Sequence, residues 1–535
     1  MTVATVSHAG PRFTAKPWVV AAVVVVPTFM EVLDTTIALV ALRYIAGGLS
    51  ATADDGEWVI TSYLAANAVI LPITGWLSAH LGRRNYFLAS IAIFTLSSLL
   101  CGLAGSLSQL ILFRVIQGLA GGGLQPSSQS VLLDAFPREK QGVAMTLFSF
   151  AALIAPIVGP TLGGWITDSY SWRWIFLINV PVGLLALAAC WATLRDPDYL
   201  VAQRAELRRR PFQFDTIGLS LLVIVAVCWE TMLSKGQEWD WLGDPFWRVQ
   251  TLAVLFIVGL VGLVFWELRH RNPVINFQPL RERNFAACCV IIFCAYLALF
   301  AATKSLLGLL QSLFGYDALS TGLVMSPSGV FAVIAMPIVG RLIGLKTDAR
   351  WLIGAGLLLM AAGNYWMSQT NLDISPAQAV WPRVVMVAGL AVCFAPANVA
   401  AYLYVPVELR GAAVGLLSLL RNEGGSVGVS LAQTFQERRD QFHTLRLGEY
   451  LDSFNAAANS FVARAHEFFH QQTADPMAAQ QFAWQQLAAL RDQQASALAY
   501  FDCFWMVAVL TFVVAFLVLL MKRSVAEKGG HVATE

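Results

Sequence analysis

The chain has 535 residues, of which 57% are hydrophobic and 13% are charged, and its formal net charge is +2. A soluble globular chain carries roughly 45–50% apolar and about 25% charged residues. This composition therefore excludes a soluble protein and predicts an all-α, polytopic membrane protein that is surrounded by the lipid bilayer. None of the eight cysteines has metal-ligand spacing, so we expect no metal site, and we expect no nucleic-acid partner.

About fourteen mostly apolar stretches follow one another along the chain, each long enough to cross ~30 Å of hydrocarbon as a helix. They begin near Trp18, Trp58, Tyr86, Leu110, Gly142, Trp174, Thr216, Arg248, Phe285, Thr321, Trp351, Trp381, Ala412 and Phe501. Lys and Arg gather in alternate connections, which the positive-inside rule assigns to the cytoplasm. We therefore expect an even number of spans and both termini in the cytoplasm.

The first stretch contains two carboxylates, Glu31 and Asp34. A charged acid within hydrocarbon is costly by a few kcal/mol or more, so it indicates a functional site such as a proton relay. Three residues apart on a helix, the two acids share one face, and we do not expect both to ionise in a medium of low dielectric constant. The alternative is that they pair with an arginine and only fix the helix.

Three further groups of residues follow. Gly75, Gly82, Arg83 and Arg84 form a tight cytoplasmic turn after the second stretch, where ordinary positive-inside charge is the simpler interpretation. The fourth stretch places Arg114 and Gln117 within an apolar run, and Arg114 is a candidate partner of the two acids.

The fifth stretch contains Gly159, Pro160, Gly163 and Gly164. Glycines four residues apart allow helices to approach closely, and a proline permits a bend.

Long connections divide the chain into three parts. We predict a six-helix bundle in residues 1–200, an accessory helix pair with basic linkers in 201–280, and a second six-helix bundle in 281–535. The linker arginines Arg208 to Arg210 suit anionic lipid headgroups. A polar excursion over residues 436–498 has apolar residues at helical spacing, which predicts amphipathic helices outside the membrane. This excursion is either a cap that packs on its own protein or a docking surface for another protein.

Polar and aromatic residues within several spans are candidates for lining a cavity. Lys304 would favour anionic substrates, unless it pairs with Glu230 or Glu423 and never meets the substrate. The complete set of cavity candidates is Gln117, Asn67, Tyr296, Phe300, Lys304, Asn398 and Glu423.

Together these motifs resemble the major facilitator superfamily. The resemblance rests on Leu33 to Thr36, Gly75 to Arg84, Arg114 to Gly118 and Gly159 to Gly164, and it extends to Trp174 to Pro181. Within the superfamily the chain is similar to the fourteen-span drug:proton antiporters and, among these, to multidrug exporters of the EmrB type from Gram-negative bacteria.

Two positions depart from the usual pattern. Ala79 stands where an acid is common, and Arg43 stands where the first motif usually ends in proline.

The resemblance implies alternating access by two six-helix bundles. It also implies proton coupling through Asp34 and Arg114, an antiporter motif at Gly159 and Pro160, and a cytoplasmic gate at Gly75 to Arg84. EmrB-type pumps work in the inner membrane with a periplasmic adaptor and an outer-membrane channel of the TolC type. The excursion over 436–498 would then dock the adaptor.

We therefore expect a proton-coupled antiporter that exports small hydrophobic or amphiphilic drugs and contributes to antibiotic resistance. No nucleotide-binding signature is present, so we expect the proton gradient to drive transport without a cofactor. One alternative is a proton-coupled importer of a small organic anion on the same fold. A second is a membrane-embedded structural or enzymatic protein that does not transport; the acids of the first stretch argue against it.

Overall fold

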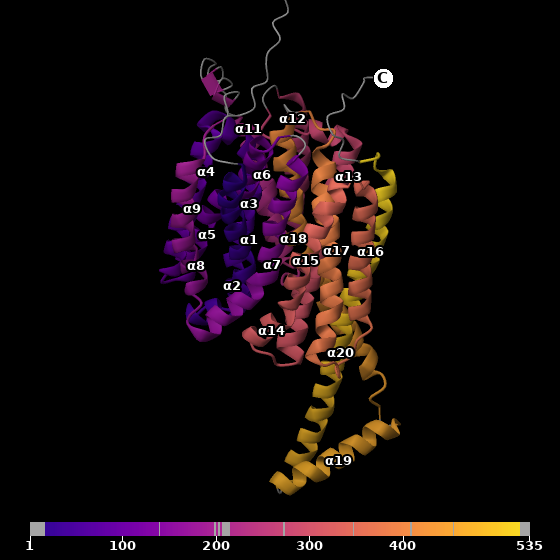
Figure 1. Ribbon diagram of the computed structural model, residues 1–535. Helices are drawn as coiled ribbons and strands as arrows, with labels where there is room; N and C mark the ends of the chain where they lie inside the picture. The colour runs from indigo at the N-terminus through magenta and orange to yellow at the C-terminus, as the bar shows by residue number, and fades with distance from the viewer. Residues whose placement is uncertain are drawn as a thin grey trace, which may run out of the picture.

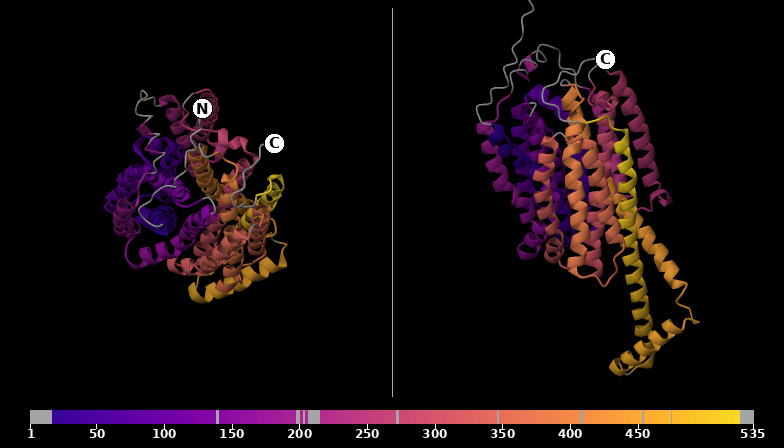
Figure 2. Two further views of the ribbon diagram at one scale, coloured as in Figure 1. Left: turned by 45° about the horizontal axis from the view of Figure 1, so that its top comes forward. Right: turned by 45° about the vertical axis from the view of Figure 1, so that its right-hand side comes forward.

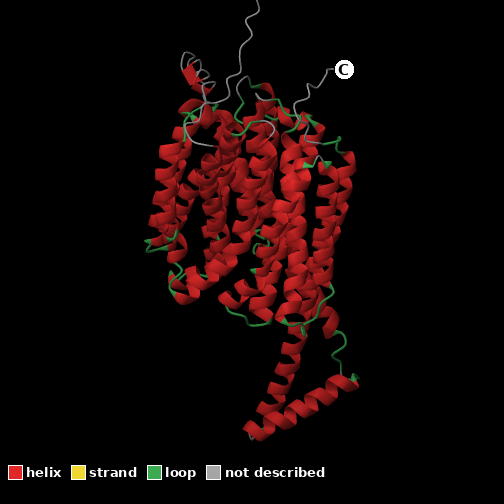
Figure 3. Ribbon diagram, in the orientation of Figure 1, coloured by secondary structure: helices red, strands yellow, loops and turns green. Residues whose placement is uncertain are grey.

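The structure is a computed structural model, in which residues 17–137, 140–196, 200–201, 204–205, 215–270, 273–345, 347–406, 409–452, 454–473 and 475–524 are described. Over these ranges the chain forms helices and no strands (Figure 3). The predicted basic linker residues Arg208 to Arg210 lie outside them.

The long helices of the first part of the chain are α1 (Pro17–Gly48), α3 (Trp58–Leu81), α4 (Arg83–Gly102), α5 (Leu107–Gly121), α6 (Leu124–Ala135), α7 (Gln141–Ser169) and α9 (Asn179–Thr193), with the short helices α2 (Ala53–Gly56) and α8 (Trp174–Leu177) between them. Next come α11 (Thr216–Lys235) and α12 (Arg248–Arg269), with the short 3₁₀ turns η2 (Trp241–Gly243) and η3 (Gln278–Arg281). The remainder comprises α13 (Arg283–Gly308), the π-helical turn η4 (Leu309–Leu313), α14 (Ala318–Met325), α15 (Pro327–Gly344), α16 (Ala349–Ser368), α17 (Pro376–Tyr402), α18 (Arg410–Gly448), α19 (Ala456–Thr473), α20 (Pro476–Ala515) and the 3₁₀ turn η6 (Phe516–Leu520).

Twelve helical segments in the described ranges are long and apolar enough to cross a membrane. They include Leu107–Ala135, which joins α5 to α6, and Leu319–Ile343, which joins α14 to α15. Helices α16 and α18 are not among the twelve, although both lie within the bundle (Figure 1). Arg421, Glu423 and several glycines lower the hydropathy of α18. The all-helical polytopic fold is thus confirmed, whereas the number of about fourteen spans and the cytoplasmic termini stay predictions.

Large apolar side chains cover the outside of the bundle. On α12, for example, Val254, Val258 and Val261 are each at least 60% exposed. Exposed apolar surface of this extent is unfavourable in water and is what hydrocarbon accepts. The helices therefore present their apolar faces to lipid and their polar residues to one another.

The helices form two groups joined by a pair. Helix α1 packs on α6, α7 and α9, while α13 packs on α17, α18 and α20. Between them α11 packs on α12 and also touches α3 and α18. The groups meet where α7 lies against α14 and α15, and where α3 lies against α18 (Figure 1). The limits predicted for the three parts, at residues 200 and 280, stay predictions.

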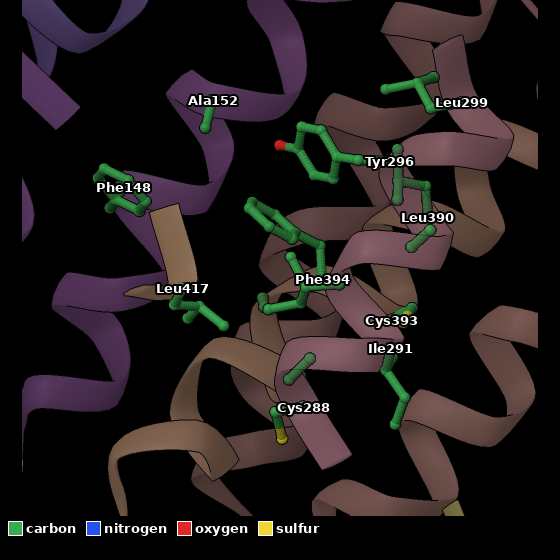
Figure 4. Packing of buried hydrophobic residues seen from close by; sticks show 14 of the residues in the cluster. Phe148, Ala152, Cys288, Ile291, Tyr296, Leu299, Leu390, Cys393, Phe394 and Leu417 are labelled. Carbon is green, nitrogen blue, oxygen red and sulfur yellow. The ribbon is translucent and has the colours of Figure 1, made fainter. Parts of the chain in front are cut away.

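A buried apolar cluster holds α7 to the helices of the C-terminal part. Figure 4 shows Phe148 and Ala152 of α7 opposite Tyr296 of α13 and Phe394 of α17, with the Tyr296 hydroxyl directed toward α7. Phe148 and Phe394 are no more than 1% exposed, and the rings of Tyr296 and Phe394 lie 5.3 Å apart between centroids. This packing positions α13, which carries candidate cavity residues.

The polar excursion of residues 436–498 forms a helical projection, in agreement with its helical spacing. Helices α18, of 39 residues, and α20, of 40 residues, run without interruption from the bundle into the projection. Helix α19 packs on α20 at the far end (Figures 1 and 2). The last span thus belongs to a helix that begins at Pro476, well before the predicted start near Phe501. We call the end of the bundle that carries this projection the outer end, as the sequence predicts, and the opposite end the inner end.

Candidate functional site

A cavity of about 120 Å³ lies between α1, α3, α11, α13 and α18. It reaches from Glu31 on α1 to Glu57 and Gln433 near the outer end. Seven aliphatic and two aromatic residues line it together with thirteen polar or charged ones. A cavity that combines apolar walls with polar and charged groups suits amphiphilic small molecules.

Asp34 lies beside this cavity, within the N-terminal helices. Its side chain is 1% exposed, and that of Arg114 is fully buried. One Asp34 oxygen accepts a hydrogen bond from Arg114 Nη1 at 2.5 Å. The other accepts from Gln117 Nε2 at 3.1 Å and from Asn179 Nδ2 at 2.8 Å. The carboxylate is thus surrounded by donors from α5 and α9, and of the two acids for which Arg114 was a candidate partner it is Asp34 that Arg114 binds.

Arg114 is in turn held by several groups. Its Nε donates to Val59 O at 3.0 Å and its Nη1 to Gln117 Oε1 at 2.9 Å. The guanidinium carbon lies 4.1 Å from the centre of the Tyr63 ring, within the range of a cation–π interaction. A buried charge pair needs such additional bonds, because Coulomb attraction alone often fails to offset desolvation.

Glu31 has a different set of partners. One of its oxygens accepts from Tyr63 Oη at 3.3 Å and from Asn67 Nδ2 at 3.2 Å. Its other oxygen accepts from Gln125 Nε2, and Gln125 Oε1 accepts from Arg421 Nη2 of α18. Glu31 is therefore linked through Gln125 to a cation from the C-terminal part of the chain.

The two acids have separate surroundings, although they share one face of α1. Glu31 lines the cavity, whereas Asp34 is absent from its lining and faces α5 and α9. Tyr63 lies between the two networks, since its hydroxyl donates to Glu31 and its ring covers Arg114. A change at one acid can thus reach the other through α1 and Tyr63.

Helix α7 contacts α1 through the predicted glycine face. A Cβ on Gly159 would collide with Thr36, and a Cβ on Gly163 would lie 3.3 Å from Ile37 Cγ2. Pro160 is buried one residue after Gly159. The following residue, Thr161, donates a 2.7 Å hydrogen bond to Gly322 O of α14. The glycines therefore bring α7 close to α1 while α7 also contacts the C-terminal part.

The turn after α3 connects several helices at the inner end. Gly82 has φ +89°, a conformation that glycine adopts readily. Arg83 pairs with Asp134 of α6, and the Arg84 backbone N–H donates to Asp196 at 2.8 Å.

Gly75 faces α18 from the same end of α3. A Cβ added to Gly75 would lie 3.6 Å from the backbone of Gly411. The glycine therefore lies where the N-terminal and C-terminal helices meet, and the arginines join helices of the N-terminal part.

The structure divides the cavity candidates into two groups. Tyr296, Phe300 and Lys304, all on α13, line the cavity. The other four do not line it: Gln117 binds Asp34, Asn67 binds Glu31, Asn398 accepts from Gln129 at 3.5 Å, and Glu423 accepts from Trp229 at 2.7 Å.

Lys304 has none of the ion pairs considered for it from the sequence. No partner of opposite charge lies within 4.0 Å of its ammonium group in the part of the chain that the structure describes, so neither Glu230 nor Glu423 is one. The lysine is half-buried and lines the cavity.

Several site residues were not predicted from the sequence. Gln125 and Asn179 complete the networks of the two acids, and Asn422 and Ser426 line the cavity. Their only signal in the sequence is a polar residue within a helical span. Such residues are too frequent in membrane helices to be selected without knowing how each helix is rotated.

Comparisons with known proteins identify a family and several relatives of this chain. A family model described as Major Facilitator Superfamily matches residues 25–429. The chain is 38% identical to "Multidrug export protein EmrB" of Haemophilus influenzae over 442 residues, which are 82% of this chain and 84% of that protein. It is 36% identical to the Escherichia coli protein of the same name over 507 residues, 94% of this chain and 95% of that one.

Solved structures also match the fold. The xylose transporter XylE from E. coli, in a partially occluded inward open conformation, superposes with a TM-score of 0.56 at 12% identity, over 94% of this chain and 96% of that one. At this identity the match supports the fold alone.

Proposed function

Because this chain belongs to the major facilitator superfamily, we propose that it is a proton-coupled antiporter that exports small hydrophobic or amphiphilic drugs by alternating access. It is a multi-pass transporter of the bacterial inner membrane and not an enzyme. Multidrug export is the activity in the names of its relatives, which match over most of the length of both chains. We further propose that the proton gradient drives transport without a cofactor.

The observation that carries this proposal is the placement of Asp34 beside Glu31. A buried carboxylate that is bound by an arginine, but closed off from the substrate cavity, is suited to gain and lose a proton as its donors move. Glu31 is three residues away on α1 and lines the cavity. Protonation of Asp34 would weaken its bond to Arg114 and shift α1, and that shift would change the cavity wall that Glu31 provides.

Alternating access requires contacts between the two halves that can break and form again. Thr161 and Gly322 join α7 to α14 toward the outer end, and Gly75 lies against Gly411 at the inner end. Small residues make these contacts with few interdigitated side chains, so they separate with little repacking. In the proposed cycle one contact opens while the other closes.

Everted membrane vesicles test the direction and the coupling. Acidifying the vesicle lumen should drive ethidium into vesicles that contain the wild-type protein, since the lumen of everted vesicles corresponds to the outside of the cell. Asp34→Asn should abolish this accumulation while Asp373→Asn, at an exposed loop carboxylate, should not. Ethidium accumulation by Asp34→Asn at the wild-type rate would refute the proton site. Release of ethidium on acidification would instead indicate import.

We also propose that the outer projection binds a periplasmic adaptor, as part of an assembly with a TolC-type outer-membrane channel. The support is the apolar surface that the projection exposes: Phe454 is 92% exposed and Phe468 is 57% exposed. The lipid bilayer does not reach this surface, because the projection extends beyond the body of the bundle (Figure 2). Aromatic side chains exposed in this way are typical of a protein interface.

A double variant, Phe454→Ser with Phe468→Ser, separates docking from transport. Ethidium transport in vesicles should stay at the wild-type level, whereas drug resistance of intact cells should fall. Phe246→Ser is the matched control, because Phe246 is 75% exposed in the connection between α11 and α12 at the same end. Unchanged resistance in the double variant would remove the docking proposal.

A further inference from the structure

The wall of the cavity formed by α11 and α18 carries polar atoms without hydrogen-bond partners. Glu230 of α11 is 2% exposed, lines the cavity, and its Oε1 has no partner among the residues that the structure describes. On α18 the same holds for Asn422 Nδ2, and Asn422 and Ser426 both line the cavity. An unpaired buried polar group is unfavourable by about 1–3 kcal/mol, more when charged. Two such groups on one wall indicate that a ligand satisfies them.

A second carboxylate lies beside Glu230. Glu423 of α18 accepts a 2.7 Å hydrogen bond from Trp229 Nε1, and Trp229 precedes Glu230 on α11. The Trp229 ring is itself fixed by stacking on Phe256 of α12, with centroids 4.6 Å apart. Trp229 therefore holds the Glu423 carboxyl group beside the turn of α11 that carries Glu230.

The cations of the site do not neutralise these two acids. Arg421 is hydrogen-bonded to Gln125 in the Glu31 network, and Lys235 pairs with Glu238 at 2.6 Å. Lys304 faces the same cavity from α13, without an ion pair to either acid. Among the described residues neither Glu230 nor Glu423 has an ion pair, and two such carboxyl groups within a membrane bundle create a local preference for a cation.

We propose that Glu230 on the cavity wall, with the carboxyl group of Glu423 behind that wall, forms a subsite for the cationic group of an amphiphilic substrate. The accessory helix α11 is then part of the substrate site. Leu233 of α11 with Ile60 and Leu64 of α3 provides an adjoining apolar wall for the remainder of such a molecule. Asn422 and Ser426 can bind its polar atoms. The inference rests on the proposed function only in that the ligand is an exported amphiphile, and it does not require proton coupling.

Two probes of the same shape and opposite charge test the subsite. Tetraphenylphosphonium and tetraphenylborate binding to the purified full-length protein is measured by equilibrium dialysis in detergent, at one pH and without a gradient. Glu230→Gln should raise the Kd of tetraphenylphosphonium at least tenfold and leave that of tetraphenylborate unchanged or lower. Asp373→Asn, at the exposed loop carboxylate used above, should change neither value.

Either of two results would overturn the proposal. One is an unchanged Kd of tetraphenylphosphonium in Glu230→Gln. The other is an equal loss for both probes, which means that the cavity has collapsed. If Glu230→Gln does not fold, Glu423→Gln must show the same selective loss.

This experiment also separates the subsite from the transport mechanism. Binding that depends on Glu230, in a protein that fails to accumulate ethidium in acidified vesicles, would retain the subsite and reject proton antiport. Proton-driven transport by a protein whose tetraphenylphosphonium binding is independent of Glu230 would retain proton antiport and reject the subsite.

Discussion

The strongest energetic prediction concerns the Asp34–Arg114 pair. Arg114→Gln removes the 2.5 Å bond to Asp34 and leaves the carboxylate with only Gln117 and Asn179 as donors. Breaking a buried ion pair from one side destabilises a protein by about 3–5 kcal/mol, because the remaining charge stays buried. We expect Arg114→Gln to lower the free energy of unfolding by about this amount.

The double variant should be more stable than this single one. With Asp34→Asn in addition, no charge remains unpaired, and an asparagine still accepts from Gln117 and Asn179. We expect a loss of about 1–2 kcal/mol for the double variant, so that the second substitution restores about 2 kcal/mol or more. The loss of unfolding free energy for Asp34→Asn alone should lie between those of Arg114→Gln and of the double variant. The reason is that Arg114 keeps its bonds to Val59 and Gln117 and its position over Tyr63.

Unfolding of the purified protein by sodium dodecyl sulfate, followed by tryptophan fluorescence, measures all three variants. The control is Asp373→Asn, at the exposed loop carboxylate used above. If the losses of the two single variants simply add in the double variant, the charges do not stabilise each other and this account of the site is wrong.

Three further predictions follow from single contacts. Gly159→Ala should destabilise the protein by about 1–3 kcal/mol and slow ethidium transport, because its Cβ would collide with Thr36; wild-type transport and stability would show that α7 need not lie this close. Lys304→Ala should weaken binding of tetraphenylborate more than of tetraphenylphosphonium, and an equal loss in dialysis would contradict an anion-binding role. In the connection before α12, hydrogen bonds from Arg248 lower the pKa of Asp244 to about 2. Since the folded pKa is below the unfolded one, Asp244 stabilises the protein fully above about pH 4 and loses this effect as the pH falls toward 2. The difference in Tm between wild type and Asp244→Asn should therefore be constant from pH 7 to 5 and shrink below pH 4, and a difference independent of pH would refute it.

The sequence predicted the features that depend on composition and local spacing. Apolar stretches located most helices to within a few residues, since burying the backbone in lipid requires helices; the exception is α20, which begins at Pro476 and not near Phe501. The fold and the family followed from motifs such as Asp34 and Gly159. Arg114 was a candidate partner of both acids, but the sequence did not place it in contact with either; the structure places it against Asp34.

The distribution of residues around the cavity could not be predicted, because it depends on how each helix is rotated. Glu423 turns toward Trp229 of the accessory helix, and Asn398 toward Gln129, so neither lines the cavity. Glu31 and Asp34 lie on one face of α1 but face different neighbours, which only the packing of α3, α5 and α9 determines. From the sequence, Glu230 was only a possible partner of Lys304. Its place on the cavity wall depends on how α11 packs against α18.

The uninterrupted course of α20 gives the protein a rigid lever. At 1.5 Å per residue its 40 residues extend about 60 Å, roughly twice the thickness of the hydrocarbon layer. A tilt of about 10° at the buried half would displace the far tip by ~5–10 Å, since a continuous helix transmits rotation without a joint. A change in the tilt of α20 within the membrane thus becomes a displacement of its far tip, which can be measured well outside the bilayer.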